Sequence, residues 1–299
     1  MKVVVFGGSG YIGRHTIPYL VQAGHEVTAV YATNKPSATL EQVQYIEGNV
    51  LDHERVRDIV EGAQVVYNFA ALADIHACLD RPAEAIQINM LGAQHILEAC
   101  VRSHITRYVQ ASSVYAHSKN GGIYSITKRF AEELVFFYHN NYHLDYTVLR
   151  YGTIYGPEEG QGNSLYRYIT QALTTGRVEY PGSGNELREY IHIEDAARLS
   201  TVILEEEYKN KVMVISGLHP YTARDVLETV NEMMHGTIEL IYGDGTPAQH
   251  YIRTPYQFFE TTAKKMISTD YIDIQQGLMD CIVKISKKLK DGNDLYEHL

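Results

Sequence analysis

The segment at the start of the chain constrains its fold more than any other. An apolar run, Lys2 to Phe6, leads into glycines at positions 7, 10 and 13, and helix-compatible sequence follows from Arg14 to Ala23. A second strand-like run, Glu26 to Tyr31, completes a β-α-β unit. Glycines at a strand-to-helix junction let the backbone turn sharply and bring N–H groups against a pyrophosphate, whose charge the helix N-terminus stabilises. The segment therefore predicts a dinucleotide-binding site.

Strand-like and helical segments keep alternating through the first half of the chain. The further strands expected from apolar patterning are residues 43–47, 64–69, 106–111 and 145–150. The helices expected between them are residues 53–60, 82–102 and 123–142. This alternation predicts an α/β fold with a doubly wound parallel sheet, which binds its ligand at the carboxyl ends of the strands.

Beyond residue 150 the pattern loosens. A helix is expected at 164–175, and a strand at 211–216 is expected to return to the sheet. We therefore expect a dinucleotide-binding domain, residues 1–162 and 188–217. A smaller substrate-binding lobe would comprise residues 163–187 and 218–299.

Composition narrows the class of protein. A net charge of −10 without a basic stretch argues against nucleic acid and anionic membranes as partners. No apolar run approaches the roughly 18 residues of a spanning helix, and the start of the chain is strand-like rather than a secretion signal. The three cysteines, Cys78, Cys100 and Cys281, lie far apart, so we expect reduced thiols, no metal site and a cytoplasmic enzyme or binding protein.

A second motif lies where the strand before residue 113 ends. Ser112 and Ser113 are followed by Tyr124 and Lys128, and residues four apart on a helix share one face. The lysine charge would draw the tyrosine pKa down from about 10, so that the phenol can act as a general base or acid. Because the chain holds 24 tyrosines, about one such pair arises by chance, and its position after the two serines carries the argument. Counting from the strand favours Ser113 over Ser112 as the hydroxyl that bonds the same oxygen.

With these motifs the chain resembles the extended short-chain dehydrogenase/reductases, the NAD(P)-dependent epimerase/dehydratase family that acts largely on nucleotide sugars. Further support comes from residues 68–71, Asn89 with Gly92, residues 149–157 and residues 188–195. The resemblance implies Ser113, Tyr124 and Lys128 as catalytic residues. It implies as cofactor-binding residues Gly7, Gly10, Tyr11, Ile12, Gly13, Asn49, Val50, Phe69, Ala70, Ala71, Lys128 and Tyr151. It implies as substrate-binding residues Thr153, Arg188 and Arg253, with Arg188 on the diphosphate.

The chain departs from the family pattern at the cofactor site. Tyr31 stands where many NAD-binding members carry an Asp on the ribose, and Arg14 and Lys35 could face a 2′-phosphate. The expected cofactor is therefore NAD or NADP, with NAD favoured. Asn49 replaces the usual Asp near the adenine and keeps a hydrogen-bonding group.

A second departure concerns the segment between the serine and the tyrosine. Ser113 and Tyr124 are closer in sequence than in other extended members. Val114 and Tyr115 supply neither the acid pair of the family's dehydratases nor the Glu of its decarboxylases. These residues favour oxidation and reduction at a single carbinol carbon, and the short segment favours an open sugar pocket.

The leading expectation is a nucleotide-sugar 4-epimerase that works by hydride transfer at the sugar C4. The alternatives are an NAD(P)H-dependent reductase of a 4-keto sugar or other carbonyl, and a non-catalytic NAD(P) sensor or scaffold. We expect a homodimer formed through the helices at 82–102 and 123–142. The sequence leaves the nucleotide and the sugar open.

Overall fold

The chain divides into two compact units in its computed structural model, which describes residues 1–33, 36, 38–158, 163–245, 250–255 and 263–294. Unit 1 comprises Met1–Tyr151, Ala196–Ile215 and Pro255–Met266. Unit 2 comprises Gly152–Asp195, Ser216–Thr254 and Ile267–Leu299.

The units differ from the expected domains at residues 152–162, 188–195 and 255–266, and also at Ser216 and Gly217, which belong to unit 2. The first two segments belong to unit 2 because β7 (Thr153–Tyr155) pairs with β9 (Leu187–His192) in a separate sheet. The third belongs to unit 1, where β13 (Lys264–Lys265) pairs with β10 (Lys211–Ile215).

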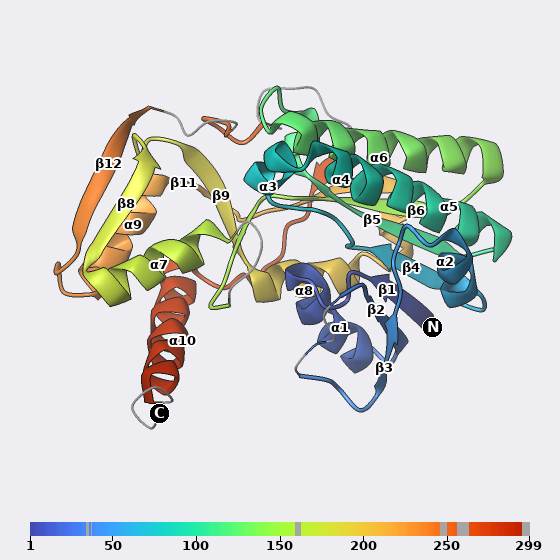
Figure 1. Cartoon of the computed structure of the whole chain (residues 1–299), viewed down its shortest axis with the longest axis horizontal. Helices are drawn as coiled ribbons and strands as arrows, with labels where there is room; N and C mark the ends of the chain where they lie inside the picture. Colours follow the sequence, from blue (N-terminus) through green and yellow to red (C-terminus); the bar gives the residue numbers. More distant parts are fainter. Residues whose placement is uncertain (34–35, 37, 159–162, 246–249, 256–262, 295–299) are drawn as a thin grey trace. The chain divides into compact units, whose positions relative to one another are not determined.

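Unit 1 is built on an eight-stranded sheet of order β13-β10-β6-β5-β4-β1-β2-β3, in which every neighbouring pair is parallel. Its other strands are β1 (Lys2–Phe6), β2 (Glu26–Tyr31), β3 (Val43–Glu47), β4 (Val65–Asn68), β5 (Arg107–Ser113) and β6 (Tyr146–Tyr151). Strands β1 to β6 of this sheet are labelled in Figure 1. Strands covered on both faces are expected to be continuously apolar, and β1 buries every residue from Val3 to Phe6. The predicted doubly wound parallel sheet is confirmed.

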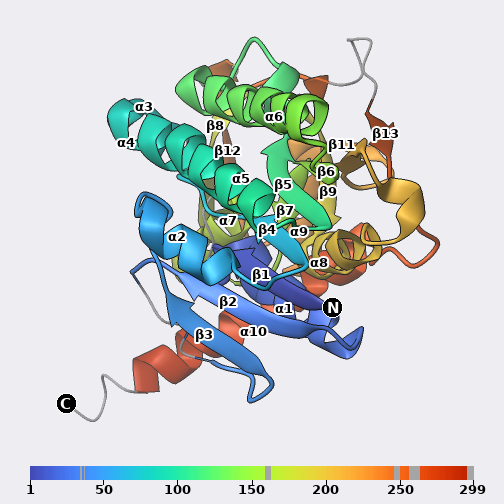
Figure 2. The same cartoon turned by 90° about the vertical axis from the view of Figure 1, so that its right-hand side faces the viewer.

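Helices cover both faces of this sheet (Figure 2). The helices α2 (His53–Val60), α5 (Gly92–Arg102) and α6 (Gly122–Tyr142) bury apolar residues against one face. On the other face lie α1 (Tyr11–Gln22) and the part of α8 (Ile193–Val202) that belongs to unit 1, where the Tyr67 hydroxyl donates to the carbonyl of Ser200 at 2.8 Å. The 3₁₀ helix η3 (Glu206–Tyr208) precedes β10.

The helical stretch expected at 82–102 contains an irregular turn. It consists of α4 (Pro82–Ile86), a π-helical turn η1 (Gln87–Leu91) and α5, and α3 (Ile75–Asp80) precedes it. Single π-helical turns occur frequently at functional sites. This one carries the buried side chain of Asn89.

The described residues of unit 2 form two small sheets and, besides the start of α8, three helices. One sheet has the order β11-β9-β7, with β11 at Pro220–Thr222, and the other pairs β12 (Glu239–Gly245) with β8 (Arg177–Gly182). The helices are α7 (Ser164–Thr175), α9 (Ala223–Met233) and α10 (Ile274–Asp294). Their buried core includes Tyr155, Ile169, Val226 and Leu278.

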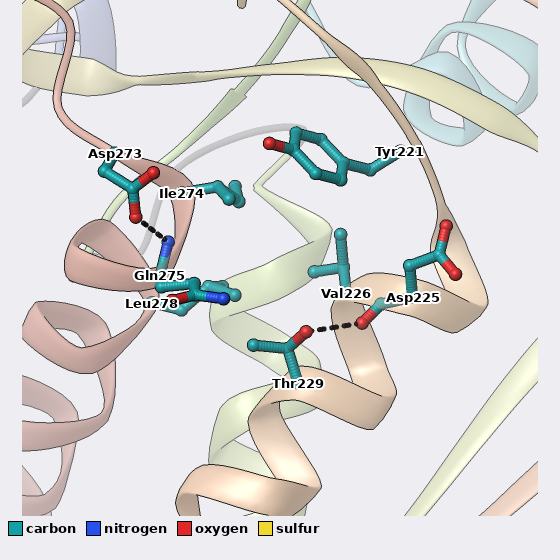
Figure 3. Close-up of a pocket in the computed structure, with 8 residues that line it drawn as sticks. All are labelled: Tyr221, Asp225, Val226, Thr229, Asp273, Ile274, Gln275 and Leu278. Atoms are coloured by element: carbon teal, nitrogen blue, oxygen red, sulfur yellow. Dashed lines mark hydrogen bonds between the residues drawn. The ribbon is translucent and has the colours of Figure 1, made fainter.

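A cavity of about 200 Å³ lies in unit 2 near the beginnings of α9 and α10 (Figure 3). Its lining residues are Tyr221, Asp225, Val226, Thr229, Asp273, Ile274, Gln275 and Leu278. Both of its carboxylates accept backbone N–H groups: Asp225 from Thr222 and Asp273 from Gln275, each at 2.9 Å. Because these carboxylates cap helices, we assign no chemistry to the cavity. No helix among the described residues is long and apolar enough to cross a membrane.

Candidate active site

The glycine turn after β1 is packed too closely for side chains at two positions. Gly7 has a φ of +75°, and a Cβ there would lie 2.6 Å from the nitrogen of Ala70 and 2.7 Å from the carbonyl carbon of Phe69. A Cβ on Gly13 would lie 2.3 Å from the oxygen of Gly7. Glycine is therefore required at positions 7 and 13, and the turn lies directly against the segment that follows β4.

Gly10 is different, because it is exposed and a Cβ there would meet only the oxygen of Gly7, at 3.1 Å. It is the N-cap of α1, which begins with Tyr11 and Ile12 and has no side-chain cap. The first N–H groups of a helix lack intrahelical partners and attract anions. The turn therefore fits the pyrophosphate of a dinucleotide.

The other expected cofactor residues of this sheet edge follow β3 and β4. Asn49 is exposed, and its Oδ1 accepts the N–H of Leu51 at 2.9 Å. Val50 is buried in the core of unit 1. Phe69, Ala70 and Ala71 are half-buried after β4, and the Ala70 N–H donates to Asn68.

Tyr31 and Arg14, which bear on the choice between NAD and NADP, lie near the same turn. Tyr31 is the last residue of β2 and is half-buried. The Arg14 guanidinium lies 5.2 Å from the ring centroid of Tyr11. Lys35, the other basic candidate for a 2′-phosphate, lies outside the described residues.

Asn89 links this edge to helix α6. Its Oδ1 accepts the N–H of Leu72 at 2.8 Å, and its Nδ2 donates to the carbonyl of Leu72 at 3.0 Å and to Thr127 Oγ1 at 3.1 Å. The π-helical turn thus places one amide between the segment after β4 and the helix that carries Tyr124. The sequence marked Asn89 only as part of the family pattern.

Tyr124 and Lys128 lie on one face of α6 and are both buried. Lys128 Nζ donates to the carbonyl of Ala111, on β5, at 3.0 Å, and lies 5.7 Å from the ring centroid of Tyr124. Burial lowers the pKa of Lys128 to about 8, because a charged ammonium is disfavoured away from water. The structure thus brings the expected Tyr/Lys pair to the end of β5.

The two serines at the end of β5 have different partners. The Ser112 hydroxyl donates to the carboxylate of Glu132, which is buried. Ser113 Oγ accepts the N–H of Tyr115 at 3.2 Å and caps the 3₁₀ helix η2 (Val114–His117). An acceptor role leaves the hydroxyl proton of Ser113 for another group.

Tyr151, the last residue of β6, is buried toward α8. Its hydroxyl lies 2.6 Å from Ser200 Oγ. Burial raises the pKa of Tyr151 well above its usual value, so the phenol stays neutral. Tyr151 lies in unit 1, as do all the other cofactor-binding candidates.

The substrate-binding candidates belong to unit 2 and gather near Tyr251. Arg188 is buried, donates from Nη1 to the carbonyl of Tyr251 at 2.9 Å, and stacks on the Tyr251 ring at 4.5 Å. Thr153 Oγ1 lies 3.4 Å from the Tyr251 hydroxyl. Arg253 lies two residues after Tyr251 in the sequence and is exposed. Sequence reasoning missed Tyr251, since no local motif marks it.

Comparisons with known proteins identify the family of this chain. Residues 3–216 match the NAD dependent epimerase/dehydratase family. The low-salt glycan biosynthesis protein Agl12 of Haloferax volcanii is 25% identical over 94% of this chain and 97% of its own length.

Two solved structures share the fold. UDP-glucose 4-epimerase of Thermotoga maritima, determined with UDP-glucose, covers 97% of this chain and 100% of its own, with a TM-score of 0.82 and 22% identity. UDP-glucuronic acid 4-epimerase of Bacillus cereus, a mutant determined with UDP-4-deoxy-4-fluoro-glucuronic acid and NAD, has the same coverage, a TM-score of 0.83 and 20% identity.

The parallel sheet, its glycine turn and the match over most of the chain define a nucleotide-binding α/β enzyme. The chain belongs to the NAD dependent epimerase/dehydratase family. Members of this family are NAD-dependent isomerases and oxidoreductases, so this is an NAD-dependent enzyme of that class.

Proposed function

We propose that this protein is a nucleotide-sugar 4-epimerase. The observation that carries the proposal is the buried Tyr124/Lys128 pair at the end of β5, in the unit that also holds the glycine turn. The turn and the segment after β4 would hold NAD, together with Asn49, Lys128 and Tyr151. When bound, NAD supplies the acceptor and donor of hydride at a sugar carbinol carbon.

The chain's own residues would move the proton. Tyr124 would take the C4 hydroxyl proton on its phenolic oxygen. It would return the proton after the 4-keto sugar has rotated to present its opposite face. The Lys128 ammonium would stabilise the phenolate, and the Ser113 hydroxyl would donate a hydrogen bond to the reacting oxygen.

Dehydration and decarboxylation fit this chain less well. The two residues that follow Ser113 are Val114 and Tyr115, and neither carries a carboxyl group. The buried carboxylate of this region, Glu132, accepts hydrogen bonds from Ser112 and Arg150. Burial alone would raise the pKa of Glu132, but its hydrogen bonds and the charge of Arg150 lower it below the usual value, so it is a poor proton donor.

The test is incubation of the purified protein with UDP-, GDP-, CDP- and dTDP-sugars, with products followed by NMR. We expect a C4 epimer to form without net consumption of reduced cofactor. Stoichiometric oxidation of NAD(P)H with a 4-keto sugar would instead support the reductase. Cofactor binding without turnover of any sugar would support a sensor or scaffold.

Arg188→Ala tests how the substrate is held. If Arg188 binds the diphosphate, the variant should lower kcat/KM by about tenfold or more, and by a similar factor for every sugar on the accepted nucleotide. Arg177→Ala is the matched control, because Arg177 is exposed on the same unit and pairs with Glu179 at 2.7 Å.

We also expect the wild-type protein to accept several sugars on one nucleotide. Strong discrimination between sugars that differ at one hydroxyl would contradict an open pocket.

We also propose a cytoplasmic homodimer. The three cysteines are free and buried, as expected of reduced thiols. Helix α6 packs against α4, η1 and α5. The exposed apolar side chains of these elements include Ile86, Leu91, Ile126, Phe130 and Phe137. Exposed apolar residues on helices that pack together favour association, here with a second copy as a four-helix bundle.

Phe130→Glu should convert the proposed dimer into a monomer, because a carboxylate at the centre of an apolar interface lacks a partner. Light scattering at micromolar concentration is the measurement. Val283→Glu, which places the same charge on an exposed valine of α10, should leave the mass unchanged. A monomeric wild type would contradict the dimer.

A further inference from the structure

A buried ion pair ties helix α6 to the end of the sheet of unit 1. Arg150 Nε lies 2.9 Å from Glu132 Oε1, and Arg150 Nη2 lies 2.6 Å from Glu132 Oε2. Both side chains are buried, with exposed fractions of 6% and 1%. Because Ser112 also donates to Glu132, this pair joins α6, which carries Tyr124, to the carboxyl ends of β5 and β6.

His117 contacts this ion pair from the solvent side. Its Nε2 lies 2.6 Å from Arg150 Nη2 and 3.4 Å from Glu132 Oε2, and its side chain is 40% exposed. A guanidinium only donates, so the shorter contact requires His117 Nε2 to be the acceptor. In this contact His117 Nε2 accepts a hydrogen bond from Arg150 Nη2.

His117 belongs to the short segment between Ser113 and Tyr124. Elsewhere in this segment the carbonyl of Tyr115 accepts the Ser125 hydroxyl at 2.8 Å. The Tyr115 ring lies edge-on to the Tyr124 ring, with centroids 6.1 Å apart. The segment thus contacts both the start of α6 and, through His117, the ion pair two turns further along that helix.

We infer that His117 is a positioning residue, which anchors residues 114–121 to the Glu132–Arg150 pair by accepting a hydrogen bond from Arg150. The anchor holds Tyr115 against Tyr124 and fixes the backbone that follows Ser113. Small displacements of a proton-transfer group lower the rate steeply. Loss of the anchor should therefore slow proton transfer, although no group that touches substrate is removed. This inference rests on the proposed function.

The test compares two substitutions at the same position. His117→Leu removes the acceptor, and His117→Gln supplies an amide oxygen that can accept from Arg150. We expect the Leu variant to lower kcat about ten- to a hundredfold, with the NAD Kd and the sugar KM changed less than about twofold. The Gln variant should recover most of kcat.

Lys119→Leu is the matched control, because Lys119 is exposed in the same segment and receives the same new side chain. It should leave kcat unchanged. A Gln variant as slow as the Leu variant, or a Leu variant as fast as wild type, would overturn the inference.

Hydrogen–deuterium exchange of the peptide covering residues 114–121 gives a readout that needs no substrate. Exchange should accelerate in His117→Leu and stay at the wild-type rate in His117→Gln and Lys119→Leu. Equal exchange in all four proteins would overturn the anchor. A wild type that turns over no nucleotide sugar would refute the proposed function instead, and the exchange rates would then decide the anchor by themselves.

Discussion

Tyr124→Phe is expected to lower kcat by about a hundred- to ten-thousandfold while the affinity for NAD stays unchanged. The substitution removes only the phenolic oxygen, and proton transfer by a positioned side chain contributes rate factors of about that size. The ring remains in the apolar cluster formed with Leu72, Ile75, Cys78 and Ala85, so the fold should tolerate the change. Steady-state kinetics with the accepted sugar and calorimetry with NAD measure the two quantities.

Two companion variants sharpen this experiment. Tyr138→Phe makes the same change at another buried tyrosine of α6 and should keep wild-type kcat. Lys128→Ala should weaken both NAD binding and turnover, since Lys128 is proposed to hold the nicotinamide ribose as well as the phenolate. If Tyr124→Phe retains wild-type kcat, Tyr124 is not the proton-transfer group.

Gly10→Val is expected to abolish measurable NAD binding without unfolding the protein. Gly10 has a φ of −71°, which valine can adopt, and its Cβ would meet only the oxygen of Gly7. The side chain would instead occupy the space beside the first turn of α1, where the pyrophosphate must approach the backbone. Calorimetric titration with NAD and the melting temperature are the two measurements.

Gly13→Val separates ligand exclusion from structural damage. Its Cβ would lie 2.3 Å from the backbone oxygen of Gly7, so this variant should lower the melting temperature clearly. NAD binding by Gly10→Val at wild-type affinity would contradict the assignment of the turn as the cofactor site.

Features carried by neighbouring residues could be predicted from the sequence alone. The apolar run of β1, the glycines after it and the helix that follows are local patterns, and each is observed close to its predicted bounds. The same holds for α2, predicted and observed at residues 53–60, and for α7 at residues 164–175. Alternation of such elements then allows few arrangements other than a parallel sheet.

Some parts of the candidate site also followed from spacing. Residues four apart on a helix share a face, so the pairing of Tyr124 with Lys128 was accessible before the fold was known. The contact of the glycine turn with the segment after β4 followed from the topology, because both lie at the carboxyl ends of adjacent strands.

Only the tertiary structure decided which side chains meet across the sequence. Glu132 meets Arg150, 18 residues away, and Arg188 meets Tyr251, 63 residues away. The same contacts show that Ser112 bonds Glu132, that His117 reaches the buried ion pair, and that residues 152–162 leave the first unit. Local sequence determines backbone preference and the spacing of apolar residues, whereas a buried polar group takes its partner from whichever strand or helix packs beside it, and that neighbour exists only once the chain has folded.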